Sequence, residues 1–306
     1  MVLHCGEAII DMIPNTSGAL VPVSGGSQLN TAISLSRLGS KAGFAGSISQ
    51  DRFGTQAVER AEREGVDMSY TLRVTEPSAL AVVQVGDQGE VAYSFYFEGT
   101  SLFAFRAEKV SSFDDTVWCL LYGSLAYYVE PLASEMQKLV HRTNKNPLLR
   151  AFDVNIRPSV ISNKSYVQKR LIDGIAECDI LKCTEEELEF LFPSLSEDKI
   201  IESCLDRGVS LICLTRGPRG ASLYTPRNSV DRPGKSVEVA DTVGAGDSFH
   251  AAVLHMLDLR EVRTQADLQA LPRTTLDEIT EYGITVSAIT CTRKGADSPH
   301  SEEIHL

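Results

Sequence analysis

The sequence DTVGAGDSF, residues 241–249, is the most informative stretch of this chain. The segment before it, SVEVA at 236–240, is rich in β-formers, and we expect it to be a strand. The segment after it has apolar residues at helical spacing, namely Phe249, Ala252, Val253, Met256 and Leu257. The stretch therefore predicts a strand, a tight glycine turn and a helix at 247–258 with one buried face.

The glycine turn has the composition of an anion-binding site. Gly244, Ala245 and Gly246 have small or absent side chains, so backbone N–H groups can converge on an anion at the start of the helix. Asp247 would repel a bound phosphate, but an attacking hydroxyl needs a carboxylate to accept its proton. The helix dipole is expected to keep this carboxylate ionised. The arrangement predicts phosphoryl transfer to an alcohol; the simpler alternative is a turn with Asp247 as the helix N-cap.

Apolar runs alternate with helical segments over most of the chain. The expected strands are 42–48, 116–122, 148–154, 178–182, 209–215 and 220–225. The expected helices are 28–38, 52–64, 131–143, 165–177, 185–191, 197–207, 247–258 and 276–290. Such alternation predicts an α/β fold in which a mostly parallel, doubly wound sheet has helices on both faces.

Two excursions of the chain, residues 6–30 and 69–100, are richer in β-formers and turns. In the second, GDQG at 86–89 separates two apolar runs, which is a strong signal for a β-hairpin. We expect the two segments to form a small β-sheet lid over a ligand at the carboxyl ends of the core strands. Residues 1–5, 31–68 and 101–306 would then form the α/β core that binds nucleotide and substrate.

The composition is that of an ordinary globular protein, with 306 residues of which 43% are hydrophobic and 23% charged. A formal net charge of −12 argues against a nucleic-acid partner. The apolar runs fall short of the roughly 18 residues that span a bilayer, so no membrane partner is expected. Seven scattered cysteines and an N-terminus without signal-peptide features favour reduced thiols and a cytoplasmic location.

Seven motifs together resemble those of the ribokinase-like (PfkB-type) carbohydrate kinases. DTVGAGD resembles the C-terminal signature of that family, and SGGSQLNTAISLSRLG at 24–39 resembles its N-terminal signature. The other motifs, in family order, are GEAIID (6–11), DVNIRP (153–158), KCTEEEL (182–188), LTRGPRGA (214–221) and CTRKGAD (291–297). The resemblance covers nearly the whole chain. It implies a ribokinase-like fold and the ATP-dependent, Mg²⁺-dependent phosphorylation of a sugar's primary hydroxyl.

The resemblance also assigns the catalytic residues. Asp247 resembles the catalytic base, and Gly244, Ala245 and Gly246 resemble the anion hole that stabilises the transferring phosphoryl group.

Six further residues resemble the family's substrate site: Asp11, Gly25, Gly26, Asn30, Asn155 and Arg157. Asp11 and Asn30 would hold sugar hydroxyls, and the two glycines would let the sugar approach the backbone. Asn155 and Arg157 follow a strand, and alternation is expected to put both on the side of the substrate or phosphate. The plainer alternatives are an exposed acid for Asp11, an N-cap for Asn30 and a structural ion pair for Arg157.

The nucleotide is expected along the 215–220 and 282–295 loops. Thr215 and Gly217 resemble residues beside the ATP phosphates and ribose, while Gly220 is equally a turn residue before a strand. Relatives often have an Asn in the helix that here reads EYGITVSAIT, residues 281–290; this chain has Gly283 and Ser287 in that region.

Metal sites are less clearly marked. Glu187 resembles a residue that orders the water shell of Mg²⁺, although Thr184 replaces the usual Asn; the alternative is a solvated acidic helix start. Asp241 and Val243 are candidates for backbone ligands of a monovalent cation such as K⁺, as in ribokinase-type chains.

The sugar is left open by the motifs. GEAIID, FYF at 95–97 and DVNIRP favour a fructokinase, but family fructokinases often have Arg after the FY where Phe97 and Glu98 stand here. The alternatives are a 2-keto-3-deoxygluconate kinase or a ribokinase, or else a non-catalytic sugar- or nucleotide-binding relative. A dinucleotide dehydrogenase is disfavoured, because G-x-G-x-x-G is missing after the first strand. A homodimer through the lid is the expected oligomer.

Overall fold

The computed structural model describes residues 1–15, 17–85, 91–113, 115–143 and 147–305. Its largest element is an eight-stranded sheet with the order β14-β13-β12-β11-β10-β9-β1-β4. The strands are β1 (Val2–Cys5), β4 (Ala42–Ala45), β9 (Cys119–Gly123), β10 (Leu149–Asp153), β11 (Ile180–Thr184), β12 (Leu211–Thr215), β13 (Ala221–Tyr224) and β14 (Ser229–Arg232). Neighbours from β4 to β12 are parallel, and β13 and β14 continue antiparallel at one edge. The predicted mostly parallel sheet is confirmed.

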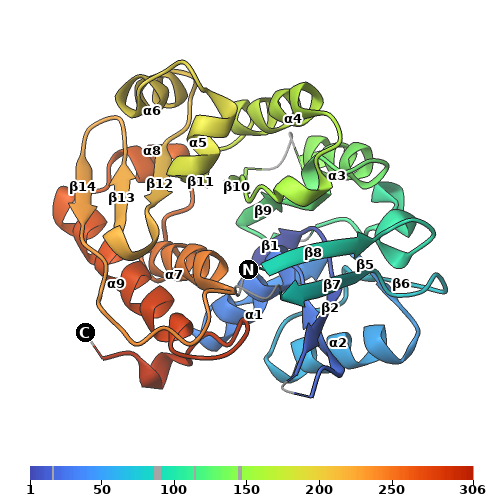
Figure 1. The fold of residues 1–306 in the computed structure, drawn as a ribbon. Coiled ribbons are helices and arrows are strands. Elements are labelled where there is room, and N and C mark those ends of the chain that lie inside the picture. Colours follow the sequence, from blue (N-terminus) through green and yellow to red (C-terminus); the bar gives the residue numbers. More distant parts are fainter. Residues whose placement is uncertain (16, 86–90, 114, 144–146, 306) are drawn as a thin grey trace.

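Helices lie on both faces of this sheet (Figure 1). They are α1 (Ser27–Arg37), α2 (Arg52–Arg63), α3 (Leu132–Arg142), α4 (Lys164–Ala176), α5 (Glu185–Leu191), α6 (Glu197–Asp206), α7 (Ala245–Leu259), α8 (Gln265–Gln269) and α9 (Arg273–Cys291). Alternate residues of β9 explain the two layers: Cys119 and Leu121 pack into the core with α1, α7 and α9, whereas Leu120 and Tyr122 pack into the core with α3 to α6.

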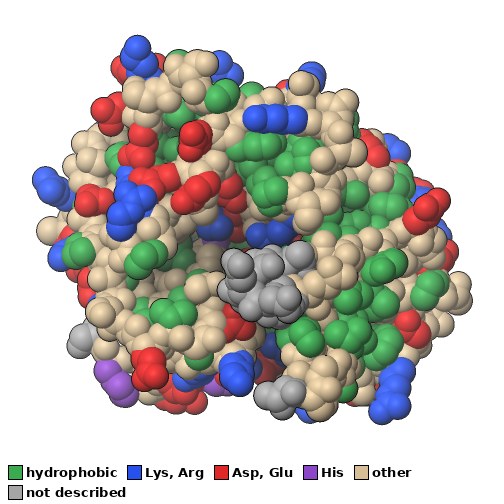
Figure 2. Space-filling view, viewed as in Figure 1, with side chains coloured by type: hydrophobic (Ala, Val, Ile, Leu, Met, Phe, Trp, Pro, Cys, Tyr) green, Lys and Arg blue, Asp and Glu red, His purple; other side chains and the backbone are tan. Residues whose placement is uncertain are grey.

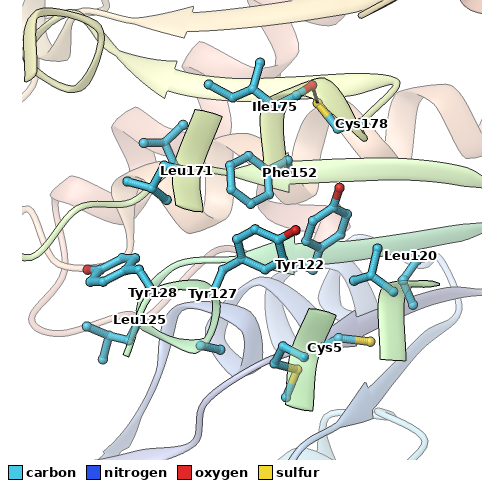
Figure 3. Packing of buried hydrophobic residues seen from close by; sticks show 14 of the residues in the cluster. Cys5, Leu120, Tyr122, Leu125, Tyr127, Tyr128, Phe152, Leu171, Ile175 and Cys178 are labelled. Atoms are coloured by element: carbon cyan, nitrogen blue, oxygen red, sulfur yellow. Dashed lines mark hydrogen bonds between the residues drawn. The ribbon is translucent and has the colours of Figure 1, made fainter. Parts of the chain in front are cut away.

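An aromatic cluster supports the strand ends on the second face (Figure 3). The ring centroid of Tyr122 on β9 lies 5.3 Å from that of Tyr127 and 5.1 Å from that of Phe152 on β10. Tyr127 belongs to a short 3₁₀ segment, Leu125–Tyr127, that follows β9 directly. Such close-packed rings hold the carboxyl ends of β9 and β10 in fixed positions.

A separate four-stranded sheet has the order β3-β2-β7-β8. Its strands are β2 (Ile9–Pro14), β3 (Leu20–Gly25), β7 (Leu80–Val85) and β8 (Val91–Tyr96). The antiparallel pairing of β7 and β8 fits the predicted hairpin, whose GDQG turn at 86–89 lies outside the described residues. Residues 27–30 begin α1, which packs on the large sheet, so the small sheet takes less of the N-terminal segment than expected.

Two strand predictions were wrong. Residues 236–240 form no strand and are exposed, because β14 ends this edge of the sheet and offers them no partner among the described residues. The run 42–48 divides at Gly46 into β4, which pairs with β1, and β5 (Ser47–Ser49), which pairs with β6 (Leu72–Val74). A Cβ at Gly46 would lie 2.5 Å from the Gly6 carbonyl oxygen, so the chain can bend there only with glycine.

The cysteines agree with the expectation of free thiols. All seven cysteines are free, and all but the partly exposed Cys291 are buried. Within the described ranges, no helix combines the length and apolar character that a bilayer crossing needs.

A buried carboxylate, Glu7, joins the two sheets and α1. It precedes β2, is 1% exposed, and its Oε1 accepts hydrogen bonds from the Ser27 backbone N–H at 3.2 Å and the Ser124 hydroxyl at 2.8 Å. Its other oxygen has no hydrogen-bond partner among the described residues. Burial raises the pKa of Glu7 to about 7. Glu7 therefore fixes the start of α1, but at a cost in stability when it is ionised.

This cost predicts a pH dependence. Because the pKa of Glu7 is about 7 in the folded chain and 4.5 unfolded, the folded state holds the proton more tightly, and stability should fall as the pH rises through this interval. The difference is on the order of 3 kcal/mol. In Glu7→Gln, whose amide oxygen can still accept both hydrogen bonds, the free energy of unfolding should fall less between about pH 5 and pH 8. Urea titrations at several pH values measure this, and parallel curves for the two proteins would contradict the assignment.

Candidate active site

Helix α7 begins at the carboxyl ends of the central strands. Its N-cap is Gly244, which has a φ of 78° and is therefore in the left-handed region that favours glycine. A Cβ at this position would also lie 2.7 Å from Cβ of Ala296. No side chain caps this helix end within the described chain. The first turn of α7 thus offers backbone N–H groups and a positive dipole end to an anion, as the sequence predicts.

Asp247 is the third residue of α7, and α1 holds its carboxylate. Oδ1 accepts a hydrogen bond from the Ser27 hydroxyl at 2.7 Å, and Oδ2 accepts one from the Asn30 side-chain amide at 3.2 Å. The N-cap alternative was wrong for Asp247, because Gly244 occupies that position. It was also wrong for Asn30, because the N-cap of α1 is Gly26, with a φ of 109°.

The environment of Asp247 makes it a stronger base. The side chain is 8% exposed, and burial raises its pKa, as does the nearby Asp153 carboxylate. The Ser27 hydrogen bond and the positive charges of Lys182 and Arg157 act in the opposite direction. The net shift of the Asp247 pKa is upward, and desolvation is its largest cause. A raised pKa suits a carboxylate that must accept a proton near neutral pH.

The small sheet brings a second carboxylate to the same place. Asp11 on β2 is partly buried, and a Cβ at Gly25 on β3 would lie 2.2 Å from its Oδ2. Burial raises the pKa of Asp11 to about 6; the Asp247 charge also raises it, and Arg157 lowers it. Arg157 and Asp247 are thus close enough to Asp11 for their charges to shift its pKa. Asn30 Oδ1 has no partner among the described residues, so it remains available to a ligand.

Asn155 and Arg157 are arranged differently from the prediction. Asn155 has a φ of 38°, so the extended alternation assumed for this loop does not hold. Its buried amide donates to the Ser124 hydroxyl at 3.3 Å, whereas Arg157 is exposed. Arg157 forms no ion pair with any described residue, which contradicts the structural-pair alternative.

The expected nucleotide residues fall into two groups. Thr215 ends β12 and Gly217 begins the 3₁₀ segment Gly217–Arg219, both at the same sheet edge as α7. Gly220 is a turn residue with a φ of 104°. Gly283 lies inside the α7–α9 interface, where a Cβ would be 2.8 Å from the Phe249 ring, so we assign it packing rather than nucleotide contact. Ser287 donates to the Ala245 carbonyl at 3.0 Å and ties α9 to the first turn of α7.

Glu187 is the buried partner of a capping box. Its Oε2 accepts from the Thr184 N–H at 2.8 Å, the Thr184 hydroxyl accepts from the Glu187 N–H at 3.2 Å, and Oε1 accepts from the Ile156 N–H at 2.9 Å. The alternative of a solvated helix start is therefore wrong for Glu187, which is 9% exposed. Thr184, which replaces the usual Asn, is the N-cap of α5.

Asp241 orders the loop before α7. Its Oδ1 accepts from the Val243 N–H at 3.0 Å and its Oδ2 from the Gly295 N–H at 2.9 Å. The Ala240 N–H also donates to the Cys291 carbonyl at 2.8 Å. The loop at 240–243 and the segment at 291–295 thus lie side by side.

Sequence reasoning missed Ser27, Asp153 and Lys182. Ser27 is part of the N-terminal signature, but its hydrogen bond to Asp247 joins residues 220 positions apart. Lys182 was marked by a signal that went unused, namely a charged residue inside the apolar run of β11. On the face viewed in Figure 2, the surface is hollowed near its centre, and acidic and basic side chains gather around the hollow.

Comparisons with known proteins point to one family. A model described as pfkB family carbohydrate kinase matches residues 1–303. A fructokinase of Rhizobium leguminosarum bv. trifolii is 33% identical over 275 residues, which cover 89% of this chain and 84% of that protein. A fructokinase of Vibrio alginolyticus is 27% identical over 292 residues, covering 95% of this chain and 92% of that one.

A solved structure has the same fold. Fructokinase from Xylella fastidiosa with bound ATP matches with a TM-score of 0.87 and 26% identity, covering 96% of this chain and 93% of that one. The family model, the relative at 33% identity and the shared fold all extend over nearly the whole chain. This chain therefore belongs to the PfkB family of carbohydrate kinases.

Proposed function

We propose that this kinase transfers the γ-phosphoryl group of ATP to a primary hydroxyl of a fructose-like ketose, with Asp247 as the general base. The observation that carries the proposal is the Asp247 carboxylate, buried at the start of α7 and held by two side chains of α1. Both donors approach from α1, and each carboxylate oxygen keeps lone-pair capacity for a substrate hydroxyl. An acceptor so fixed needs little rearrangement when the hydroxyl attacks.

The first turn of α7 supports the second half of the reaction. Gly244 and Gly246 would present backbone N–H groups where negative charge develops on the transferring phosphoryl group, and the Ala245 N–H, which donates to the Thr242 carbonyl at 3.3 Å, would exchange that bond for the phosphoryl group. The base and this anion hole belong to one helix turn, so a hydroxyl bound to Asp247 lies next to a phosphoryl group bound to the turn. The proton passes to Asp247 as the oxygen–phosphorus bond forms and the bond to ADP breaks.

The small sheet supports a sugar rather than another alcohol. Asp11, Asn30 and the backbone at Gly25 and Gly26 would bind hydroxyl groups, with Asn30 Oδ1 as a free acceptor. We propose that the small sheet, which is built from within residues 6–30 and 69–100, acts as a lid over this sugar, and that residues 1–5, 31–68 and 101–306, together with the start of α1, bind the nucleotide and the remaining substrate groups.

The choice of fructose is supported by the relatives. The Rhizobium and Xylella proteins that resemble this chain are both named fructokinase. One observation favours 2-keto-3-deoxygluconate as a second candidate. Arg157 is exposed, has no ion-pair partner in the described chain and lowers the pKa of Asp11 by its charge, which would suit a sugar carboxylate.

Mg²⁺ is proposed to enter with ATP, neutralising phosphate charge. Glu187, whose two oxygens each accept a backbone N–H, is proposed to contact the ion through water. For K⁺, the carboxylate of Asp241 is occupied by two N–H groups, which leaves backbone carbonyls around Val243 as the proposed ligands. Equal kcat in KCl and NaCl would remove the K⁺ proposal.

A homodimer in the cytoplasm is proposed for the assembly and location. Leu20 and Val21 on β3 and Tyr96 on β8 are exposed apolar side chains at the two edges of the small sheet. Such side chains favour contact with another surface. Sedimentation at the mass of one chain would contradict the dimer.

Substrate preference tests the proposed reaction. With MgATP, kcat/KM for fructose should exceed that for ribose and 2-keto-3-deoxygluconate by about tenfold or more, the scale of discrimination that a few pocket contacts supply. A preference for 2-keto-3-deoxygluconate would contradict the proposal that fructose is the substrate, and it would assign Arg157 to binding the carboxylate of that sugar acid. Phosphorylation of none of the three would favour a non-catalytic relative.

Removal of the proposed base tests the mechanism. In Asp247→Asn the amide oxygen can accept from Ser27, and a rotated Asn30 amide can accept from the new donor through its free oxygen. The melting temperature should stay nearly unchanged, while kcat falls about 10²–10⁴-fold, the usual contribution of general-base catalysis. Initial rates and thermal melts should be measured on the same preparation.

A matched control is available on α8. Asp267 is also an acidic residue at the third helix position, and it accepts from the backbone N–H groups of Arg263 and Thr264. Asp267→Asn should keep the wild-type kcat. A folded Asp247→Asn protein that also keeps the wild-type kcat would show that Asp247 is not the base.

A further inference from the structure

Lys182 is a buried cation inside the apolar strand β11. It is 4% exposed, and its Nζ lies 2.9 Å from Oδ1 and 3.3 Å from Oδ2 of Asp153 on the neighbouring strand β10. Burial by itself lowers the pKa of Lys182, but the carboxylates of Asp153, Glu187 and Asp247 outweigh it, and the net shift is upward. Lys182 is therefore a fixed positive charge.

This charge lies against the first turn of α7. A Cβ at Gly246 would be 3.0 Å from the Lys182 Nζ, so the ammonium group touches the backbone of the proposed anion hole. A cation at the positive end of a helix dipole is unfavourable, and a buried ion pair loses much of its Coulomb energy to desolvation. The Lys182–Asp153 pair therefore contributes little stability at the start of α7, and an anion bound beside Lys182 would make its position favourable.

Among the described residues, Asp153 is the acid that accepts hydrogen bonds from Lys182, so one N–H donor of the ammonium group remains for such an anion. Both oxygens of Glu187 accept backbone N–H groups, and those of Asp247 accept from Ser27 and Asn30. The Asp153 carboxylate accounts for two of the three N–H donors of Lys182. On the other side of Asp153, His250 Nδ1 lies 3.6 Å from Oδ2.

We propose that Lys182 binds the transferring phosphoryl group at the start of α7, and that Asp153 is the positioning residue that holds it there. The inference rests on the proposed reaction at this helix turn. Lys182 makes and breaks no covalent bond; it offsets the negative charge that develops on the phosphoryl oxygens, where a preorganised cation acts most strongly. Its partner Asp153 keeps the ammonium group oriented when no substrate is bound.

The competing explanation is a purely structural ion pair, and two variants separate the two. Lys182→Met alone would leave Asp153 buried and unpaired, which can unfold the chain. The double variant Lys182→Met/Asp153→Asn removes both charges and should restore the melting temperature. Its kcat with saturating MgATP and fructose should nevertheless stay about 10²–10³-fold below wild type, the usual effect of losing one donor from an oxyanion site. A double variant with the wild-type kcat would overturn the proposal.

If the double variant does not fold, the comparison of Asp153→Asn with Lys182→Met decides. Both variants break the Lys182–Asp153 pair. If the pair is only structural, the loss of kcat should follow the loss of melting temperature in the same proportion in both variants. The proposal predicts a much smaller loss for Asp153→Asn, which keeps the ammonium group, and equal losses would overturn it.

The exposed pair Lys169 and Asp173 provides a control with the same chemistry at 2.6 Å on α4. Lys169→Met/Asp173→Asn should keep the wild-type kcat. Asp247→Asn distinguishes a failure of the Lys182 proposal from a failure of the proposed reaction site. If Asp247→Asn is inactive while Lys182→Met/Asp153→Asn is fully active, only the role of Lys182 fails; if both are fully active, the proposed reaction site fails.

Discussion

The hydrogen bonds from α1 to the Asp247 carboxylate are the constraint on which this site depends. Ser27 and Asn30 lie one helical turn apart on α1, and each donates to one oxygen of Asp247 on α7. The same Ser27 donates its backbone N–H to Glu7, at the entry to the small sheet. Three segments that are distant in sequence are thus fixed relative to one carboxylate, and the large sheet beneath them supplies the common base (Figure 1).

Electrostatics determines how readily the carboxylates around Asp247 accept a proton. Burial raises the pKa values of Glu7, Asp11 and Asp247, so the site holds carboxyl groups that are stronger bases than usual. The positive charges of Lys182 and Arg157 oppose that shift at Asp247. In the proposed reaction, this balance leaves a carboxylate that can accept a hydroxyl proton next to a helix end that can bind a phosphate. Stability is lost at the same groups, because a buried carboxylate is costly when it ionises.

The fold was largely predictable because its signals are local. Helical spacing after Phe249, alternating β and α segments and the two glycine signatures correctly predict α7, the parallel sheet and the start of α1. The failures also have physical causes. The residues at 236–240 have strand propensity but no neighbouring strand, and Gly46 bends a run that looks continuous. Propensity does not report which partners the tertiary structure provides.

The site was predictable in part for the same reason. Asp247 and its glycine turn stand out because an acid beside three small residues needs a chemical explanation. The Ser27, Asp153 and Lys182 contacts could not be found in this way, since each depends on which strand ends and helix starts meet in space. Glu187 shows the converse: its motif is recognisable, but its capping box and the Ile156 contact limit what it can do.

A crystal structure of the complex with fructose, ADP, Mg²⁺ and aluminium fluoride tests the central claim most directly. Aluminium fluoride mimics the phosphoryl group in transfer, so its position reports where charge develops. The account predicts the fluoride ligands at the N–H groups of residues 244–246, with a fructose hydroxyl within hydrogen-bond distance of the Asp247 carboxylate. A complex in which the sugar hydroxyl facing the metal fluoride contacts another acid, and Asp247 remains bound only to Ser27 and Asn30, would contradict it.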